Sequence, residues 1–75
     1  MSVLPQVSGR EVIAALEKTG YERDRQKGSH RVLRQISYPN RRLVVPDHKE
    51  IAKGTLRAII KQAGLTVEEF NQLLR

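Results

Sequence analysis

Apolar and polar positions follow two different periods along the chain, and each change of period marks a boundary between helical and extended segments. The apolar positions of the first helical face are Val12, Ile13 and Leu16. They predict a helix from about Gly9 to Lys18. Ser8 and Glu11 have the spacing of a capping box, in which each side chain satisfies a backbone N–H at the helix start. Gly20 stands where a helix commonly ends in a left-handed residue.

Three short extended segments follow, and each ends at turn-forming residues. We predict strands at Tyr21–Gln26, His30–Ser37 and Arg41–Val45. Gly28-Ser29 separates the first two strands, and Pro39-Asn40 separates the second from the third. Connections this short favour an antiparallel meander. The second strand mixes apolar and cationic residues on both faces, so the pattern does not decide which face packs on the helices.

The C-terminal part of the chain predicts two more helices. The clearest helical stripe consists of Leu56, Ile59, Ile60 and Ala63. It predicts a helix from Thr55 to about Ala63 that ends at Gly64. Thr66 and Glu69 form a second capping box at the start of a last helix. The side chains expected to close one edge of the core are Phe70, Leu73 and Leu74.

Taken together, these elements predict a single α+β domain over residues 1–75, in the order α-β-β-β-α-α. The expected architecture has two layers, a three-stranded antiparallel sheet with helices packed on one face and the other face free. A chain of this length withdraws only about 60% of its unfolded surface from water. It therefore has no room for a second domain or a deep substrate cavity.

The net charge of +6 is unevenly distributed. Between Arg23 and Lys61 there are eleven Lys and Arg residues against three acidic residues, so this segment alone carries +8. A segment this basic suits a polyanion, and the phosphate backbone of a nucleic acid is the obvious one. The plainer interpretation is a solvated surface with scattered cations, because a basic patch alone identifies a partner class only weakly.

The absence of cysteine excludes disulfides and thiolate zinc sites and is typical of a reducing compartment. The first residues lack the basic and apolar regions of a signal peptide, and no run of 18 apolar residues occurs. We therefore expect a soluble, cytoplasmic protein with no membrane segment.

A histidine stands in the most basic part of the chain, directly after the predicted Gly28-Ser29 turn. Histidine changes charge near neutral pH, so an exposed His30 among phosphate-binding cations is a candidate proton carrier. Residues that can support it, by stabilising charge or orienting a phosphate, are Lys27, Gly28, Ser29 and Arg31. The plainer interpretation is a hairpin turn followed by an ordinary strand residue.

Cations and a second histidine also precede the helix predicted at Thr55. His48 can be a partner acid, a phosphate contact or a residue that only hydrogen-bonds its loop. Lys49 and Lys53 can either solubilise this loop or, with the helix N-terminus, bind phosphate. The residues expected to contact a nucleic-acid backbone are Arg25, Arg34, His48, Lys49, Lys53 and Arg57. The only aromatic residues are Tyr21, Tyr38 and Phe70, too few for base stacking to dominate affinity.

Several motifs in order along the chain resemble a known family. They are Ser8-Gly-Arg-Glu-Val-Ile, Arg25-Gln-Lys-Gly-Ser-His30, Val45-Pro-x-His48, Gly54-Thr-Leu-Arg-x-Ile-x-Lys-Gln-Ala-Gly-Leu65 and Val67-Glu-Glu-Phe70. In this order they resemble the HicA (YcfA-like) toxins of toxin–antitoxin systems, over about nine-tenths of the chain. The family often has an aromatic residue two or three positions after its histidine, where this chain has Val32 and Leu33. The resemblance therefore does not extend to base stacking by this strand.

The resemblance implies a small mRNA interferase with a double-stranded-RNA-binding-domain-like fold, neutralised by a HicB-like antitoxin. It also implies that His30 is the essential histidine. The chemistry of the residues agrees, because two histidines without a carboxylate cluster suit cleavage without a metal or other cofactor. In such a reaction the ribose 2′-OH is the nucleophile, a histidine moves a proton, and cations stabilise the extra negative charge. DNA lacks this hydroxyl, so the mechanism predicts RNA as the only substrate, and the resemblance implies that this RNA is mRNA.

Two other functions remain open from the sequence. One is an RNA-binding module on the same scaffold that does not cut RNA. The other is a protein-interaction subunit whose basic surface serves only its antitoxin-like partner. Substitution of His30 separates an enzyme from a binder, and the salt dependence of RNA binding separates both from an interaction subunit.

Overall fold

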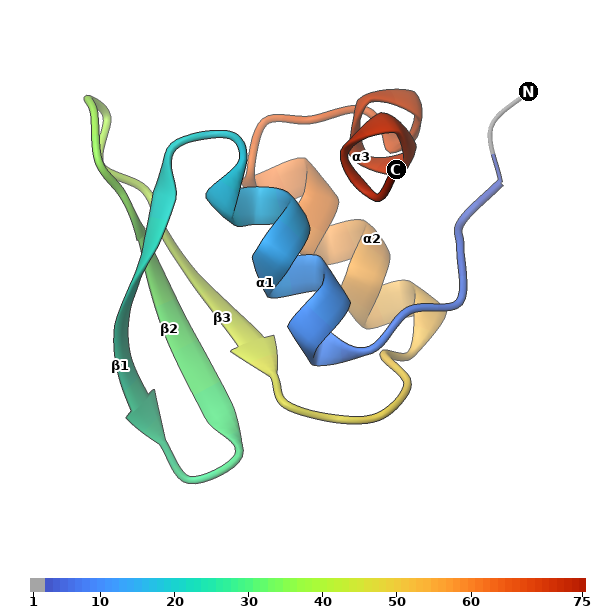
Figure 1. The fold of residues 1–75 in the computed structure, drawn as a ribbon, viewed down its shortest axis with the longest axis horizontal. Helices are drawn as coiled ribbons and strands as arrows, with labels where there is room; N and C mark the ends of the chain where they lie inside the picture. The colour runs from blue at the N-terminus through green and yellow to red at the C-terminus, as the bar shows by residue number, and fades with distance from the viewer. Residues whose placement is uncertain (1–2) are drawn as a thin grey trace.

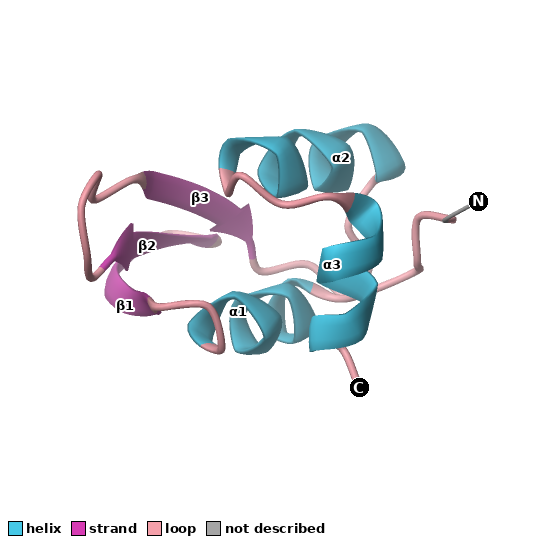
Figure 2. Cartoon of the chain, turned by 90° about the horizontal axis from the view of Figure 1, so that it is seen from above, coloured by secondary structure: helices cyan, strands magenta, loops and turns pink. Residues whose placement is uncertain are grey.

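A computed structural model describes residues 3–75 and has the predicted order of elements. The elements are α1 (Gly9–Glu17), β1 (Tyr21–Lys27), β2 (His30–Gln35), β3 (Arg42–Pro46), α2 (Lys53–Gln62) and α3 (Val67–Leu73). The strands form one antiparallel sheet in the order β1-β2-β3. Figures 1 and 2 show two layers, with all three helices on one side of the sheet. The predicted α+β architecture is confirmed.

Local signals position the helices as predicted. Both capping boxes form, with Glu11 N–H donating to the Ser8 hydroxyl at 3.1 Å and Glu69 N–H donating to Thr66 Oγ1 at 3.1 Å. Gly20 follows the last turn of α1 with φ +91°, a left-handed conformation that glycine adopts without steric cost. None of the helices described within residues 3–75 is long and apolar enough to cross a membrane.

The register of the sheet decides which face packs on the helices. Leu33 on β2 pairs with Leu43 on β3, and both are completely or almost completely buried under the helices. Their neighbours Val32 and Val44 pair on the opposite, open face, where Val44 is 50% exposed. Strand side chains alternate between the two faces of a sheet. The buried Leu33 therefore determines the face on which each remaining side chain of β2 lies.

The core lies between the sheet and the helices. Its fully buried large side chains are Phe70, Ile13, Leu16, Leu33, Leu43, Leu56, Val12 and Val45. α3 packs against both α1 and α2, so Phe70 closes the core as predicted. Of the two tyrosines, Tyr21 is buried and Tyr38 is exposed.

Several element boundaries differ from the predicted ones. β1 ends at Lys27, one residue later than predicted. β2 ends at Gln35 and not at Ser37, because the Asn40 side chain donates to the carbonyls of Gln35 and Ile36 and closes the turn early. β3 runs from Arg42 to Pro46, one residue later than predicted. α2 begins at Lys53 and not at Thr55, since Ala52 occupies the N-cap without any side-chain hydrogen bond. Lys53 therefore lies in the first turn of the helix.

Candidate active site and nucleic-acid interface

The β1–β2 connection presents His30 at one end of the sheet. Gly28 and Ser29 form the two-residue turn, and Gly28 has φ +62°, as the first position of a type II′ hairpin turn requires. The Gln26 side chain donates to the Gly28 carbonyl at 3.1 Å. His30 is exposed and pairs across the strands with Lys27. Directly opposite residues share a face, so the imidazole and an ammonium group lie together on the open face.

Arg31 does not share this face. It follows His30 by one residue, so its side chain points to the helix side of β2. There its Nε lies 3.8 Å from a carboxylate oxygen of Asp47, and only 24% of the Arg31 side chain is exposed. The structure thus brings Lys27 to His30, whereas it places the guanidinium of Arg31 behind the strand.

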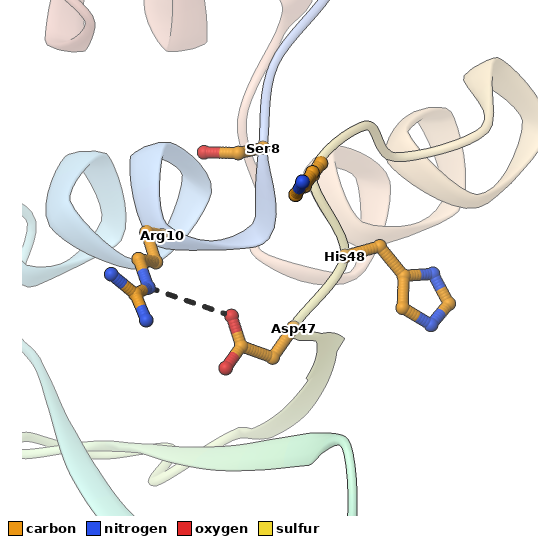
Figure 3. A pocket seen from close by; sticks show the side chains of 5 residues that line it. Ser8, Arg10, Asp47 and His48 are labelled. Atoms are coloured by element: carbon orange, nitrogen blue, oxygen red, sulfur yellow. Dashed lines mark ion pairs between the residues drawn. The ribbon is translucent and has the colours of Figure 1, made fainter.

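The segment after β3 lies directly beside the turn. Asp47 N–H donates to the Ser29 carbonyl at 2.6 Å, and the Asp47 carboxylate also lies 3.9 Å from the Nε of Arg10 at the start of α1. Figure 3 shows the Asp47 carboxylate directed toward Arg10, while the His48 imidazole points away from both. Ser29, Asp47 and α1 are therefore held together, and His48 faces solvent.

A second contact fixes the same loop to α1. Gly9 N–H donates to the His48 carbonyl at 2.9 Å. A Cβ atom on Gly9 would lie only 2.1 Å from the Pro46 carbonyl oxygen, so no larger residue fits without moving the loop. A shallow polar hollow of about 380 Å³ remains beside this contact, lined by Ser8, Arg10, Asp47, His48 and Lys49.

Ion pairs divide the cations of the basic segment into two groups. On the open face, Arg34 pairs with Glu22 and Arg42 pairs with Asp24, which neutralises the end of the sheet away from His30. Arg23 pairs with Glu17 of α1. Among residues 3–75, no acidic partner is found within ion-pair distance of Arg25, Lys27, Lys49, Lys53 or Arg57. The uncompensated charge therefore extends over the His30 turn, the loop after β3 and the start of α2.

These uncompensated groups lie along one edge of the molecule. In Figure 1 the β1–β2 turn and the loop between β3 and α2 form the lower edge, and α1 and α2 begin above that loop. The first turn of α2 has no acidic residue and no side-chain cap. Its free N–H groups and the helix dipole favour an anion, beside the exposed Lys49 and Lys53. Arg57 is exposed on the next turn of the same helix.

One contact in this region was not predicted from the sequence. Asp47 and Arg10 meet only because the loop after β3 folds against α1, and nothing in their sequence spacing indicates this contact. Within residues 3–75, no three His, Asp or Glu side chains are grouped so that they could hold a metal ion.

Residues 9–65 match the protein family described as HicA toxin of bacterial toxin-antitoxin. The matched segment contains the His30 turn, the whole sheet, the Asp47 loop and α2. A comparison with curated proteins finds no match.

Proposed function

Because the chain belongs to the HicA toxin family of bacterial toxin–antitoxin systems, we propose that it is a metal-independent endoribonuclease that cleaves mRNA and thereby inhibits translation. The observation that supports this most directly is the exposed His30 beside Lys27, on a two-residue turn at the basic edge. The proposed site of action is the cytoplasm, where mRNA is translated.

Two protons move in the proposed reaction, one from the attacking ribose 2′-OH and one to the leaving 5′-oxygen. His30 carries one of them and solvent water carries the other. The 2′-oxygen forms a bond to phosphorus, the bond to the 5′-oxygen breaks, and a cyclic phosphate is left on one fragment. Lys27, on the same face, stabilises the charge that develops on the phosphoryl oxygens. Gly28 permits the turn, and the Ser29 hydroxyl can orient the phosphate. Arg31 supports the site from behind the strand and not by direct contact.

RNA binding is proposed for the uncompensated cations of the lower edge, namely Arg25, Lys49, Lys53 and Arg57, with His48 as a further phosphate contact. Arg34 lies on the same open face as His30, but Glu22 already neutralises its charge. We therefore expect Arg34 to contribute less to phosphate binding than Lys27 or Lys53. Contacts of this kind position the backbone and carry no sequence information, so cleavage specificity is expected to be loose.

The family implies a cognate antitoxin partner. We propose that this partner is a HicB-like protein with an acidic surface that covers the basic edge and excludes RNA. Charge complementarity supports this, because the Arg23–Lys61 segment carries a net +8, and Lys27, Lys49 and Lys53 have no acidic partner within residues 3–75.

The proposed activity predicts cleavage of a long single-stranded RNA by the purified protein in EDTA. The fragments should carry 5′-hydroxyl ends, and DNA of the same sequence should remain intact because it lacks the 2′-OH nucleophile. End-labelling of the fragments and gel electrophoresis measure both results. Intact RNA that is still bound would contradict the enzyme and favour a non-catalytic RNA-binding module. Cleavage only after addition of a divalent metal would contradict the metal-independent mechanism.

The proposed phosphate contact at α2 predicts a change in salt dependence. Lys53→Gln should reduce the slope of log Kd against log salt by roughly one counterion, because one phosphate contact is lost. Lys61→Gln is the matched control, since it removes the same charge from an exposed position in the last turn of the same helix. Fluorescence anisotropy in the His30→Ala background measures affinity without cleavage. Equal slopes for both variants would contradict an RNA contact at the helix start.

A further inference from the structure

Asp47 follows β3 directly, at the end of the sheet that carries His30. Both its backbone and its side chain make contacts there. Its N–H donates to the Ser29 carbonyl at 2.6 Å. Its two carboxylate oxygens lie 3.9 Å and 3.8 Å from the guanidinium groups of Arg10 and Arg31. The residue thus connects the turn before His30, the strand after it and the start of α1.

These contacts act on both sides of His30 in the sequence. Ser29 precedes the histidine and Arg31 follows it, and both are held by the same residue. His30 itself is paired with Pro46, directly before Asp47. A hairpin turn at the end of a sheet is otherwise free to bend, because only one of its sides is packed. Asp47 therefore restricts the backbone of the proposed catalytic residue without contacting its imidazole.

The carboxylate is also suited to this task by its environment. Its side chain is 21% exposed, so solvent screens its ion pairs less than those of a fully exposed residue. An acidic group at this edge opposes RNA binding, because it repels phosphate. Its presence among uncompensated cations is therefore better explained by positioning than by contact with RNA.

From these contacts we infer that Asp47 is a positioning residue for His30, holding the Gly28-Ser29 turn in register with α1 through Ser29 and Arg31. This rests on the proposed ribonuclease activity. Reactions at phosphorus require close alignment of the proton carrier, and a displacement of about 1 Å can slow a reaction by roughly 10²-fold. Arg31 acts in the same unit, from the helix side of β2.

The test uses Asp47→Asn, which keeps the backbone hydrogen bond and the size of the side chain but removes the charge. The matched control is Asp24→Asn, which breaks a comparable ion pair, with Arg42 at 3.1 Å, at the other end of the open face. Both substitutions raise the net charge by one unit. Both should therefore strengthen RNA binding to a similar extent by general electrostatics.

Single-turnover cleavage of one RNA over a range of protein concentrations separates binding from chemistry. We expect Asp47→Asn to lower the maximal rate by at least about tenfold, as a partial misplacement of His30 would. Asp24→Asn should leave this rate unchanged, and both variants should show a lower protein concentration at half-maximal rate. Equal maximal rates in Asp47→Asn and Asp24→Asn would overturn the inference while leaving the proposed function intact. Intact RNA with the wild-type protein would overturn both.

Arg31→Gln tests the same unit from its other side and covers the case in which Asp47→Asn does not fold. Circular dichroism first establishes that each variant is folded. We expect Arg31→Gln to lower the maximal rate, and the double variant with Asp47→Asn to be little slower than the slower single variant, because both remove one contact. Fully additive losses, or an unchanged rate in Arg31→Gln, would overturn the inference.

Discussion

Replacing His30 with alanine is expected to slow RNA cleavage by roughly 10²- to 10⁴-fold, the contribution typical of a positioned general acid or base. RNA affinity should stay close to that of the wild type, because the cations of the lower edge are unchanged. His30 is exposed and begins β2, whose buried side is held by Leu33, so removal of the imidazole leaves the core intact. Cleavage of single-stranded RNA in EDTA, with anisotropy for binding, measures both quantities.

His48→Ala provides the matched control for this experiment. His48 is the only other histidine in the chain, is also exposed and lies on the loop beside the same turn. Its ring points away from Asp47 and Arg10 (Figure 3). We expect this variant to bind RNA somewhat more weakly and to cut bound RNA at nearly the wild-type rate. Equal losses of rate in the two variants would contradict the assignment of the proton transfer to His30 alone.

Replacing Phe70 with alanine is expected to lower the free energy of unfolding by about 3–5 kcal/mol. Phe70 is the largest of the fully buried side chains and lies where α3 meets α1 and α2. A domain of 75 residues has a total stability of about 4–11 kcal/mol by the usual range per residue. The loss is therefore a large part of the total.

Urea unfolding followed by circular dichroism measures this loss. Leu74→Ala, at the end of the same helix and only partly buried, is the comparison and should cost distinctly less. A loss of less than about 1 kcal/mol for Phe70→Ala would contradict its place in the core.

The result also bears on the domain boundary, because α3 begins at Val67 and lies beyond the matched residues 9–65. We propose that residues 1–75 form one folding unit that includes α3.

The order of elements was predictable because its signals are local. Capping boxes, left-handed glycines and apolar periodicity act over a few residues and require no knowledge of distant contacts. The boundaries that were predicted wrongly depend on contacts between segments or on weak caps. The Asn40 side chain donates to the Gln35 carbonyl, five residues earlier, and so ends β2 early. Ala52 is the N-cap of α2 and makes no side-chain hydrogen bond.

The candidate site was predictable only in part, for the same reason. Lys27 and His30 flank a two-residue turn, and any hairpin at that turn places them opposite each other. Arg31 was expected to act beside His30, yet the packing of Leu33 against the helices turns it to the other face. Mixed apolar and cationic residues on both faces of β2 gave no indication of this choice.

By itself, therefore, the sequence determined the elements, their order, the hairpin that carries His30 and the excess of positive charge. Each of these depends on residue types within a few positions or on simple addition of charge. The tertiary structure alone decided which face of β2 is open, which cations are neutralised by Glu22, Asp24 and Asp47, and how Asp47 joins the turn to α1. These depend on packing between segments far apart in the chain, where a shift of one residue in register would exchange the two faces.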